Sequence, residues 1–585
     1  MAFYHLSILV FSVISSYIQI YLGVSASLTI VALASTFIIV RNMTCTENKD
    51  LYFSNIKSFL FPLAITLFFF AISVFPPIYD DEFSYVATLP KLYNELGKIQ
   101  YISSFGIWTT LYQSYESVLT AFKSLGENLL PLRAFNLLIL FGIFLVFESR
   151  FNQKLNFCHK LFLRSLILSI PILALNGLIL KNDIFAGYCI LLAVNYLFYE
   201  KQSFKNETIG ILALAILGTL KPIFYTDGLV IAFFYFFIKR KKGFNVNKTI
   251  FLKFFYIFSI ANAPWLLKNL LELNQPFFPL YKIPYLNFSL SEFNDHYNIY
   301  KTMFSELIYG LKNFSYSNGD LSWFVKNILN RFGSVYLAIL LVGIFKFKNA
   351  RAYLNITLLV SIFSFSLWEL RYHIGVVLAA YLFLIEYYKD LSNYVYRNIK
   401  SLKNTFSYVS LVLLMIILVP QYNNALRVYK HFYVDPSIYY YRSGYEEFVQ
   451  KYMSMRQNNE LINFLNANAK NSNIYIDNSI FYYLDNSIHY YWLNTTNMSM
   501  IPGDYYQFKN LLYERKIKYI VYDMNTLKGL TDFGWKKDKI PNIVKFYQQY
   551  HDFITMLEAE KKVKFITKFS DPEAIHETSI YEVIY

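Results

Sequence analysis

Charged residues and cysteines are both scarce in this chain of 585 residues. Asp, Glu, Lys and Arg make up only 16% of it, whereas soluble domains carry about a quarter of charged residues. The three cysteines, Cys45, Cys158 and Cys189, are widely spaced and form neither a disulfide framework nor a metal-ligand pattern. These shortages argue against an ordinary soluble domain and against a disulfide-rich scaffold.

A nucleic-acid-binding surface is also missing, although the formal net charge is +15. The clearest basic run, Lys239 to Lys242, directly follows an apolar segment. Basic residues at that position are typical of the cytoplasmic flank of a membrane span. No basic groove with interleaved aromatic rings and no RNA-binding signature is present, so we expect no nucleic-acid partner.

Long apolar runs dominate the rest of the sequence, which is 55% hydrophobic and 20% aromatic. Each run is close to the roughly 20 residues that an α-helix needs to cross a bilayer. The pattern predicts an α-helical polytopic membrane bundle of about 13 spans. We expect them at 3–23, 24–41, 58–76, 132–149, 161–180, 183–199, 207–220, 223–238, 250–267, 333–347, 352–369, 372–388 and 404–420.

The connections between these runs alternate in charge. One set is short and rich in Lys and Arg, which identifies it as cytoplasmic; it includes the connections at 41–57, 150–160, 201–205, 239–242, 346–351 and 389–403. The first run has no charged leader or cleavage site, so we expect a retained span and a cytoplasmic N-terminus. The sequence thus predicts a multi-pass protein of the plasma (inner) membrane.

The other set of connections holds the unusual polar residues, and we expect it to face outward. They are Asp80, Asp81 and Glu82; Lys181, Asn182 and Asp183; Lys221 and Asp227; Lys268; and Glu369, Arg371 and His373. Segments far apart in the sequence would therefore bring acids and bases to one face of the membrane.

The first long outer loop, 77–131, contains two expected helices. One covers 82–96, with Asp81 as its cap and Gly97 at its end. The other covers 107–125, where Ile107, Leu111 and Tyr115 begin an apolar stripe at intervals of three and four residues. Such an amphipathic helix lies along a membrane surface or packs on the bundle.

The tail, 421–585, is expected to form a separate periplasmic or extracellular α/β domain beyond the membrane domain, 1–420. Helices are predicted at 459–470, 508–515 and 542–560, and strands at 473–477, 517–522, 563–569 and 579–585. Their alternation favours a partly parallel sheet. No Gly-x-Gly-x-x-Gly follows a strand, so nucleotide binding is not expected.

Several short motifs follow one another along the membrane domain. They are Asp81-Glu82 after an early span, Lys181-Asn182-Asp183 at the outer start of a later one, Lys221 in Gly218-Thr219-Leu220-Lys221-Pro222, Pro264-Trp265 with Asn274-Gln275-Pro276, and Arg371-Tyr372. In order and sidedness, residues 58–390 resemble the GT-C glycosyltransferases, in particular the protein O-mannosyltransferases and lipid A aminoarabinose transferases. Two spans before the acidic pair, and a triplet in its place, depart from that family's pattern.

The resemblance implies a membrane glycosyltransferase that takes a sugar from a polyprenyl-phosphate donor and inverts its anomeric centre. The acceptor would be a glycan, a lipid or a protein. Asp81, in its pair with Glu82, would be the catalytic base, although the triplet leaves Asp80 open as the base. Asp183, Lys221, Arg371 and Tyr372 would bind substrate, the two cations at the donor phosphate. A divalent cation is possible, but no ligand spacing requires one.

Each of these residues also has a purely structural interpretation. Asp81 and Asp183 could cap helices, Lys221 could be an interfacial anchor, and Arg371 could pair with Glu369. Two other functions compete: an O-antigen-type polymerase or ligase, and a non-enzymatic transporter of lipid or polysaccharide. Transporters place their sites near the midplane of repeated halves, whereas this chain shows no paired halves.

Overall fold

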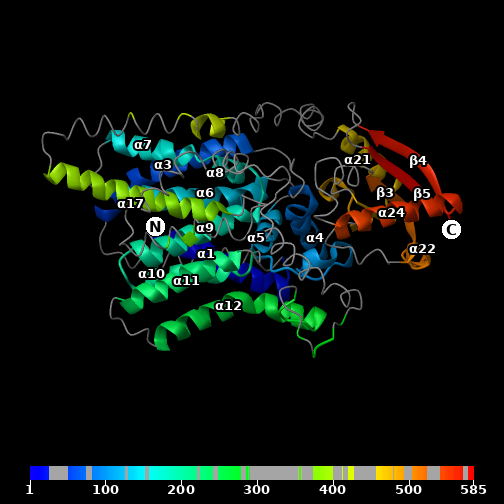
Figure 1. The fold of residues 1–585 in the computed structure, drawn as a ribbon, viewed down its shortest axis with the longest axis horizontal. Helices are drawn as coiled ribbons and strands as arrows, with labels where there is room; N and C mark the ends of the chain where they lie inside the picture. The colour runs from blue at the N-terminus through cyan, green and yellow to red at the C-terminus, as the bar shows by residue number, and fades with distance from the viewer. Residues whose placement is uncertain are drawn as a thin grey trace.

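The structure is a computed structural model in which most of the chain is described. The described residues are 1–24, 50–73, 82–125, 130–151, 157–220, 224–241, 248–278, 373–398, 421–426, 456–477, 480–492, 504–523, 541–570 and 577–585, with a few single positions between them. They form a helical bundle at the N-terminal side and a small sheet domain at the C-terminal side (Figure 1). Both parts of the expected architecture, helices and C-terminal sheet, are therefore present.

The bundle is built from helices that run roughly along one axis (Figure 1). They are α1 (Ala2–Tyr21), α3 (Asp50–Ser73), α6 (Leu130–Arg150), α7 (Phe157–Leu168), α8 (Pro171–Leu178), α9 (Asn182–Val194), α10 (Phe204–Leu217), α11 (Phe224–Lys241), α12 (Lys248–Leu273) and α17 (Ile374–Asn398). A π-helical turn, η3 (Asn195–Tyr199), extends α9. α9 is buried along its whole length, as expected for the central helix of a membrane bundle.

The number of membrane spans is only partly supported. Within the described residues, three helices are long and apolar enough to cross a bilayer: Ala2–Tyr21, Pro131–Arg150 and Ile250–Leu273. The expected span 333–347 lies outside the described residues, as do nearly all of 24–41, 352–369 and 404–420. The structure thus supports a membrane-spanning bundle without confirming thirteen spans.

The expected span at 161–180 is a bent pair of helices, which together are long and apolar enough to cross a bilayer. α7 and α8 meet at an angle of 60°. Pro171 is the first residue of α8, where its missing N–H costs nothing, and it forces Ile170 away from the helical region. Ile170 accordingly has φ −71° and ψ 108°. α8 therefore starts in a new direction and ends beside α9.

The expected helix at 107–125 is wrong in its first half. The α-helix α5 covers only Ser114–Lys123, and it follows a 3₁₀ segment, η2 (Ser103–Thr109). Gly106 within η2 has φ 52° and ψ −127°, a conformation that interrupts any helix and that glycine adopts most easily. The polar Gln113 and Glu116 are buried as well, so α5 is an interior helix and not a surface one.

The other expected helix of this loop is confirmed as two pieces. A π-helical turn, η1 (Glu82–Val86), is followed by α4 (Thr88–Leu96), which ends at Gly97 with φ 73°. α4 packs on α5, and Asn94 Nδ2 donates a hydrogen bond to Thr120 O at 2.9 Å. Asp81, the expected cap, lies outside the described residues.

The two ends of the bundle carry different connections. The predicted outer connections lie at one end, and the basic connections lie at the other. We call the end that carries residues 82–125 the loop end. There Ile99 N donates to Gln19 O at 3.1 Å, and Ser114 N donates to Thr219 O at 3.1 Å. Lys268 Nζ of α12 donates to Thr109 O at 2.7 Å. The connections that the sequence assigns to the outer face therefore lie together.

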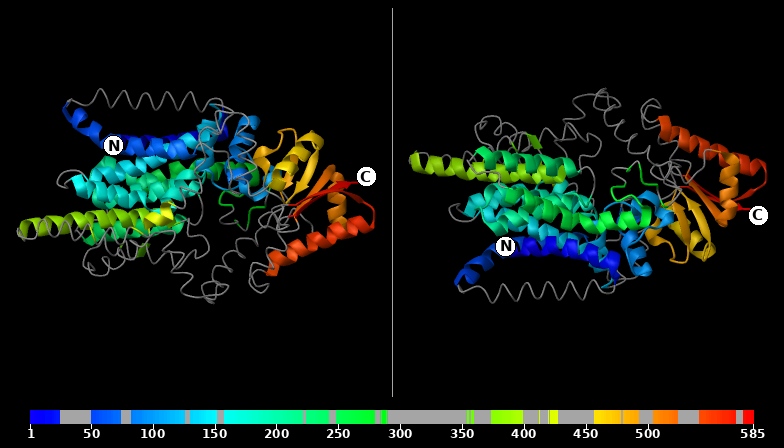
Figure 2. Two further views of the ribbon diagram at one scale, coloured as in Figure 1. Left: turned by 90° about the horizontal axis from the view of Figure 1, so that it is seen from above. Right: turned by 90° about the horizontal axis from the view of Figure 1, so that it is seen from below.

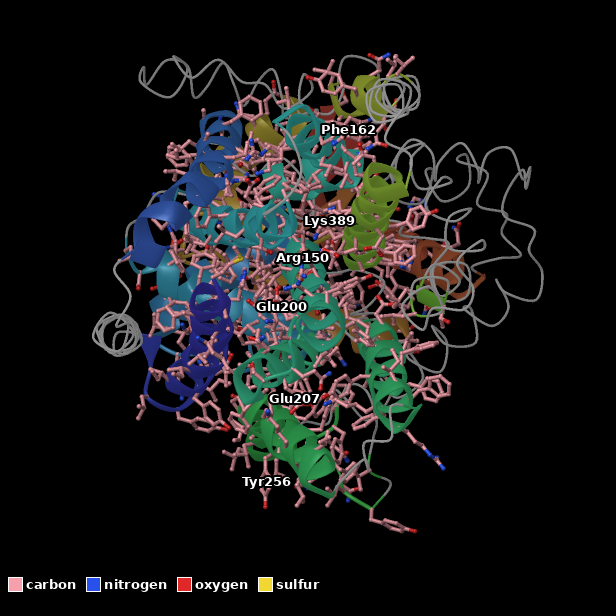
Figure 3. The ribbon with its side chains drawn as sticks, turned by 90° about the vertical axis from the view of Figure 1, so that its left-hand side faces the viewer. Arg150, Phe162, Glu200, Glu207, Tyr256 and Lys389 are labelled. Atoms are coloured by element: carbon pink, nitrogen blue, oxygen red, sulfur yellow. The ribbon has the colours of Figure 1, made fainter. Side chains whose placement is uncertain are left out.

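The opposite end, the basic end, gathers the connections that are rich in Lys and Arg. Arg150 at the end of α6 contacts Glu200 at 2.6 Å and Glu386 of α17 at 3.8 Å. Figure 3 looks onto this end and shows Arg150 and Glu200 between Lys389 and Glu207. Within the described helices, residues next to the basic connections therefore lie together at this end.

The C-terminal domain contains a five-stranded sheet in the order β2-β1-β3-β5-β4. Its strands are β1 (Asn473–Ile476), β2 (His489–Trp492), β3 (Ile517–Asp523), β4 (Val563–Ser570) and β5 (Glu577–Val583), and its helices are α21 (Arg456–Asn468), α22 (Tyr505–Glu514) and α24 (Pro541–Ala559). β1 is parallel to β2 and β3, while β5 is antiparallel to β3 and β4. The prediction of a partly parallel sheet is confirmed, and β2 was not predicted.

The sheet domain lies beyond the loop end of the bundle, next to α4 (Figures 1 and 2). Its 3₁₀ turn η7 (Phe481–Tyr483) contacts η1 and α4, and β2 contacts η2. The segment 82–109 therefore separates the helical bundle from the sheet.

Candidate active site at the loop end

A buried carboxylate marks the start of the first outer loop. Glu82 begins η1 and is 0% exposed. Its Oε1 accepts a hydrogen bond from Leu180 N at 2.5 Å and lies 3.0 Å from Arg133 Nη1. The Arg133 side chain is 2% exposed. A buried charge is tolerated only when it is paired and hydrogen-bonded, and Glu82 meets both conditions.

Arg133 and Asn136 of α6 hold the chain that leads from α8 to α9. The two are three residues apart and so share one face of the helix. Arg133 Nη1 donates to Leu178 O at 2.5 Å, and Asn136 Nδ2 donates to Ile179 O at 2.8 Å. These carbonyls follow the end of α8, where Ile179 is extended and helical partners are missing. The α6 side chains replace those partners.

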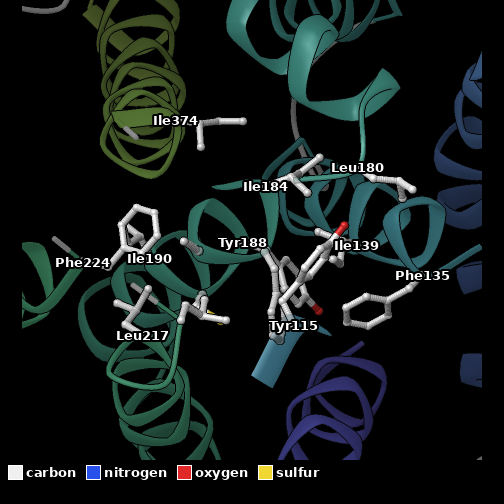
Figure 4. Close-up of a cluster of buried hydrophobic side chains, with 14 of the residues drawn as sticks. Tyr115, Phe135, Ile139, Leu180, Ile184, Tyr188, Ile190, Leu217, Phe224 and Ile374 are labelled. Atoms are coloured by element: carbon white, nitrogen blue, oxygen red, sulfur yellow. The ribbon is translucent and has the colours of Figure 1, made fainter. Parts of the chain in front are cut away.

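α5 completes this arrangement from the other side. Tyr115 Oη donates a hydrogen bond to Asn136 Oδ1 at 2.5 Å, and Tyr115 is fully buried. Figure 4 shows Tyr115, Phe135, Leu180 and Ile184 in the same apolar cluster, with Tyr188 and Ile139 among them. The hydrogen-bonded group Glu82, Arg133, Asn136 and Tyr115, which we call the anchor, therefore joins four segments of the chain. It fixes the position of residue 82 relative to α9.

The predicted Lys181-Asn182-Asp183 motif directly follows the anchored segment. All three residues are buried, and Asp183 lies in the first turn of α9, where the helix dipole favours a negative charge. Asn182 Oδ1 is buried without a hydrogen-bond partner among the described residues. The same holds for the side-chain amide oxygens of Gln19, Asn176, Asn262 and Asn269. At Asn182, a bound ligand that donates a hydrogen bond would pair this acceptor.

The beginning of α17 reaches the same part of α9. A Cβ added to Gly187 would come within 2.8 Å of Ile374 Cγ2, and one added to Gly375 within 3.1 Å of Gly187 Cα. The two glycines thus allow α9 and α17 to approach closely. Gly187 is about one helical turn from Asp183. His373, which follows the predicted Arg371-Tyr372 pair in sequence, is buried beside this contact.

Several predicted site residues cannot be placed directly. Asp80, Asp81, Lys221, Arg371 and Tyr372 lie outside the described residues. Their nearest described neighbours, Glu82, Leu220 and His373, are all buried and belong to segments that end or begin at the loop end. Of the predicted site residues, the structure describes Glu82 and Asp183, and both are buried.

Sequence reasoning missed Arg133, Asn136 and Tyr115. The signal was present for Arg133, because an ionisable residue within an apolar run usually has a function and a partner. Asn136, three residues later on the same face, could have strengthened that signal. Tyr115 could not be distinguished from the other apolar and aromatic residues of its stripe.

No group of three or more His, Cys, Asp or Glu side chains suited to a metal ion occurs within the part of the chain that the structure describes. Glu82 is already engaged by Arg133 and Leu180 N, so it is poorly suited to a cation. A search of family models and of curated proteins finds no match to this chain.

Proposed function

We propose that the chain is an integral-membrane glycosyltransferase that moves a sugar from a polyprenyl-phosphate donor to an acceptor at the outer membrane face. The observation that carries the proposal is the anchor, in which buried Glu82 is paired with Arg133 at 3.0 Å. Asp81 is joined to Glu82 by a peptide bond, which keeps consecutive Cα atoms about 3.8 Å apart. A fixed Glu82 therefore restricts where the carboxylate of Asp81 can lie.

In this mechanism the acceptor hydroxyl or amine attacks the anomeric carbon of the donor sugar. The bond between that carbon and the phosphate oxygen breaks, and its electron pair stays on the phosphate. The acceptor proton passes to the carboxylate of Asp81, or of Asp80 if that residue is the base. A positioned base typically contributes about 10²–10⁴-fold to such a reaction. Attack opposite to the leaving group inverts the anomeric centre.

The remaining residues have supporting roles. Lys221 and Arg371 would stabilise the charge that grows on the leaving phosphate, because cations in a water-poor site are effective there. Asp183 and Tyr372 would bind the sugar, and the unpartnered Asn182 Oδ1 would accept a sugar hydroxyl. We assign Glu82 to positioning instead of proton transfer, because Arg133 and Leu180 N already occupy its Oε1.

The test uses purified full-length protein in liposomes with a panel of polyprenyl-phosphate sugars. We expect sugar transfer that falls at least about 100-fold in Asp81→Asn or in Asp80→Asn, which also identifies the base. Glu95→Gln is the matched control, since Glu95 is an exposed carboxylate of the same loop and its loss should leave the rate within twofold. Equal rates in wild type and both Asp variants would remove this mechanism.

One observation favours the transport alternative, and the same liposome assay tests it. Polar side chains line the buried face of α1, where His5 Nδ1 lies 2.6 Å from Tyr188 Oη and Gln19 Nε2 donates to Ser117 O at 2.7 Å. Hydrogen bonds between helices also serve simply to dock them, which is the interpretation we prefer. Movement of the donor lipid across the liposome bilayer without transfer of its sugar would support transport instead.

A further inference from the structure

The C-terminal domain contacts the same short helix that carries the anchored Glu82. η1 is tied to the bundle through Glu82, and η7 of the sheet domain packs against η1. η1 is therefore contacted from two sides by two different parts of the chain. π-helical turns such as η1 are rare and occur frequently at functional sites.

Three aromatic rings form a continuous stack across this contact. Tyr85 of η1 stacks on Trp108 with ring centroids 4.7 Å apart and planes at 18°. Trp108 in turn stacks on Trp492 of β2 at 5.8 Å and 22°. Stacked and edge-on aromatic pairs stabilise a contact by about 0.5–1.5 kcal/mol beyond the area that they bury. The stack leads from the sheet domain to a residue only three positions from Glu82.

A second group of rings and a lysine reinforce the contact. Phe105 meets Phe481, Tyr490 and Trp492 edge-on, with centroids 5.6, 5.6 and 6.1 Å away. Lys91 Nζ of α4 donates to Leu484 O at 2.9 Å and to Tyr482 O at 3.3 Å. These bonds satisfy carbonyls at the end of η7 with a charged donor, which is the stronger kind of hydrogen bond.

We infer that Trp492 is a positioning residue for the proposed transfer reaction: the C-terminal domain holds η1 in place through the Trp492–Trp108–Tyr85 stack. This inference rests on the proposed function for its catalytic part. Trp492 acts through Trp108, Tyr85 and η1. The C-terminal domain is then part of the catalytic unit and not an independent accessory module.

The test compares Trp492→Ala, Trp492→Phe and Tyr491→Ala in the full-length protein. Tyr491 is the matched control because it lies on the opposite face of β2, where it packs on Tyr475 and Arg515. Hydrogen exchange of the backbone amides of residues 82–96 measures the support of the turn without reference to activity. We expect faster exchange there in Trp492→Ala and unchanged exchange in Tyr491→Ala.

The kinetic readout separates positioning from folding. We expect kcat to fall about 10–100-fold in Trp492→Ala, with KM for the donor within twofold, and Trp492→Phe to recover most of the loss. If Trp492→Ala does not fold, Lys91→Gln provides the same exchange test from the other side of the contact. Unchanged exchange at 82–96, or faster exchange with unchanged kcat, overturns the inference. If the wild-type protein transfers no sugar but exchange at 82–96 is still faster in Trp492→Ala, the coupling between Trp492 and η1 is retained and the proposed function is rejected.

Discussion

The two ends of the helical bundle use charged residues in different ways. At the loop end, the Glu82–Arg133 pair is removed from solvent and holds irregular backbone between α8 and α9. At the basic end, Glu207 is partly exposed and lies 3.4 Å from Lys239 and 3.3 Å from Lys253. These basic-end pairs join the ends of regular helices and contact water.

This difference indicates that the buried pair at the loop end serves to fix the position of the backbone and not to add stability. A buried ion pair gains little net stability over apolar residues of the same size, so its presence needs another reason. Fixing the turn that follows Asp81 is such a reason. Partly exposed pairs at helix ends need no functional explanation, because they cost little and contribute little.

The largest expected effect follows from breaking the buried pair. Arg133→Met leaves the Glu82 carboxylate without its cationic partner and Leu178 O without its side-chain donor, and we expect the free energy of unfolding to fall by about 3–5 kcal/mol. Unfolding in mixed micelles of increasing denaturing detergent measures it. Adding Glu82→Gln to Arg133→Met removes the buried charge and should restore part of the loss. A single-variant loss no greater than that of a basic-end variant would contradict the contrast between the ends.

A smaller effect is expected at the second residue of the anchor. Asn136→Ala removes the donor to Ile179 O and the acceptor of Tyr115 Oη, and leaving such buried groups unpaired costs about 1–3 kcal/mol. The same unfolding assay applies. Tyr115→Phe removes one of the two bonds and should cost less than Asn136→Ala. The reverse order would show that Tyr115 and not Asn136 is the centre of this group.

The contrast between buried and exposed carboxylates recurs in the sheet domain. Burial and the neighbouring Asp523 carboxylate raise the pKa of Asp477 well above its ordinary value of 3.8. A raised folded-state pKa means a stability cost that is absent below about pH 3.8 and grows as the pH rises toward the raised value. Asp477→Asn should therefore stabilise the protein by about 1 kcal/mol at pH 7 and have no such effect at pH 3.

Asp485 provides the opposite case within that domain. Hydrogen bonds from the Ser487 backbone and hydroxyl lower the pKa of Asp485 to about 2. Asp485→Asn should therefore not stabilise the protein at pH 7. Stabilisation by both substitutions would show that the effect comes from net charge and not from the surroundings of Asp477.

The smallest effect is expected at the basic end. Glu207→Gln removes the carboxylate that faces Lys239, Lys253 and Tyr235, and we expect the free energy of unfolding to change by about 1 kcal/mol or less. Raising the salt concentration should reduce even that difference, because exposed pairs are screened. A loss of unfolding free energy comparable to that of Arg133→Met would show that the basic-end pairs stabilise the fold as much as the buried pair does.

The sequence predicted most strongly where periodicity and turn residues agree. The helices and strands of the C-terminal domain follow their expected ranges closely, except that the four-residue strand β2, His489–Trp492, was too short to be recognised. The whole range 107–125 was assigned to one helix. Within it, Trp108 instead stacks on Trp492 of the sheet domain, and that contact cannot be read from local sequence.

The candidate site was predicted only in outline. The sequence indicated which connections share an end of the bundle, because charge alternates along the chain. It did not reveal that Glu82 is paired with Arg133, since that pair joins residues on separate helices through tertiary packing. The bend within 161–180 was also missed, although Pro171 lies there and proline favours a break.

The orientation of the two ends in the membrane tests the account most directly. With Cys45, Cys158 and Cys189 replaced, a single cysteine is introduced at Lys98 near the loop end or at Lys201 at the basic end, both exposed positions. A membrane-impermeant maleimide applied to intact cells should label the cysteine at position 98 and reach position 201 only after the membrane is opened. Labelling of position 201 alone in intact cells would place η1 in the cytosol and contradict the proposed site.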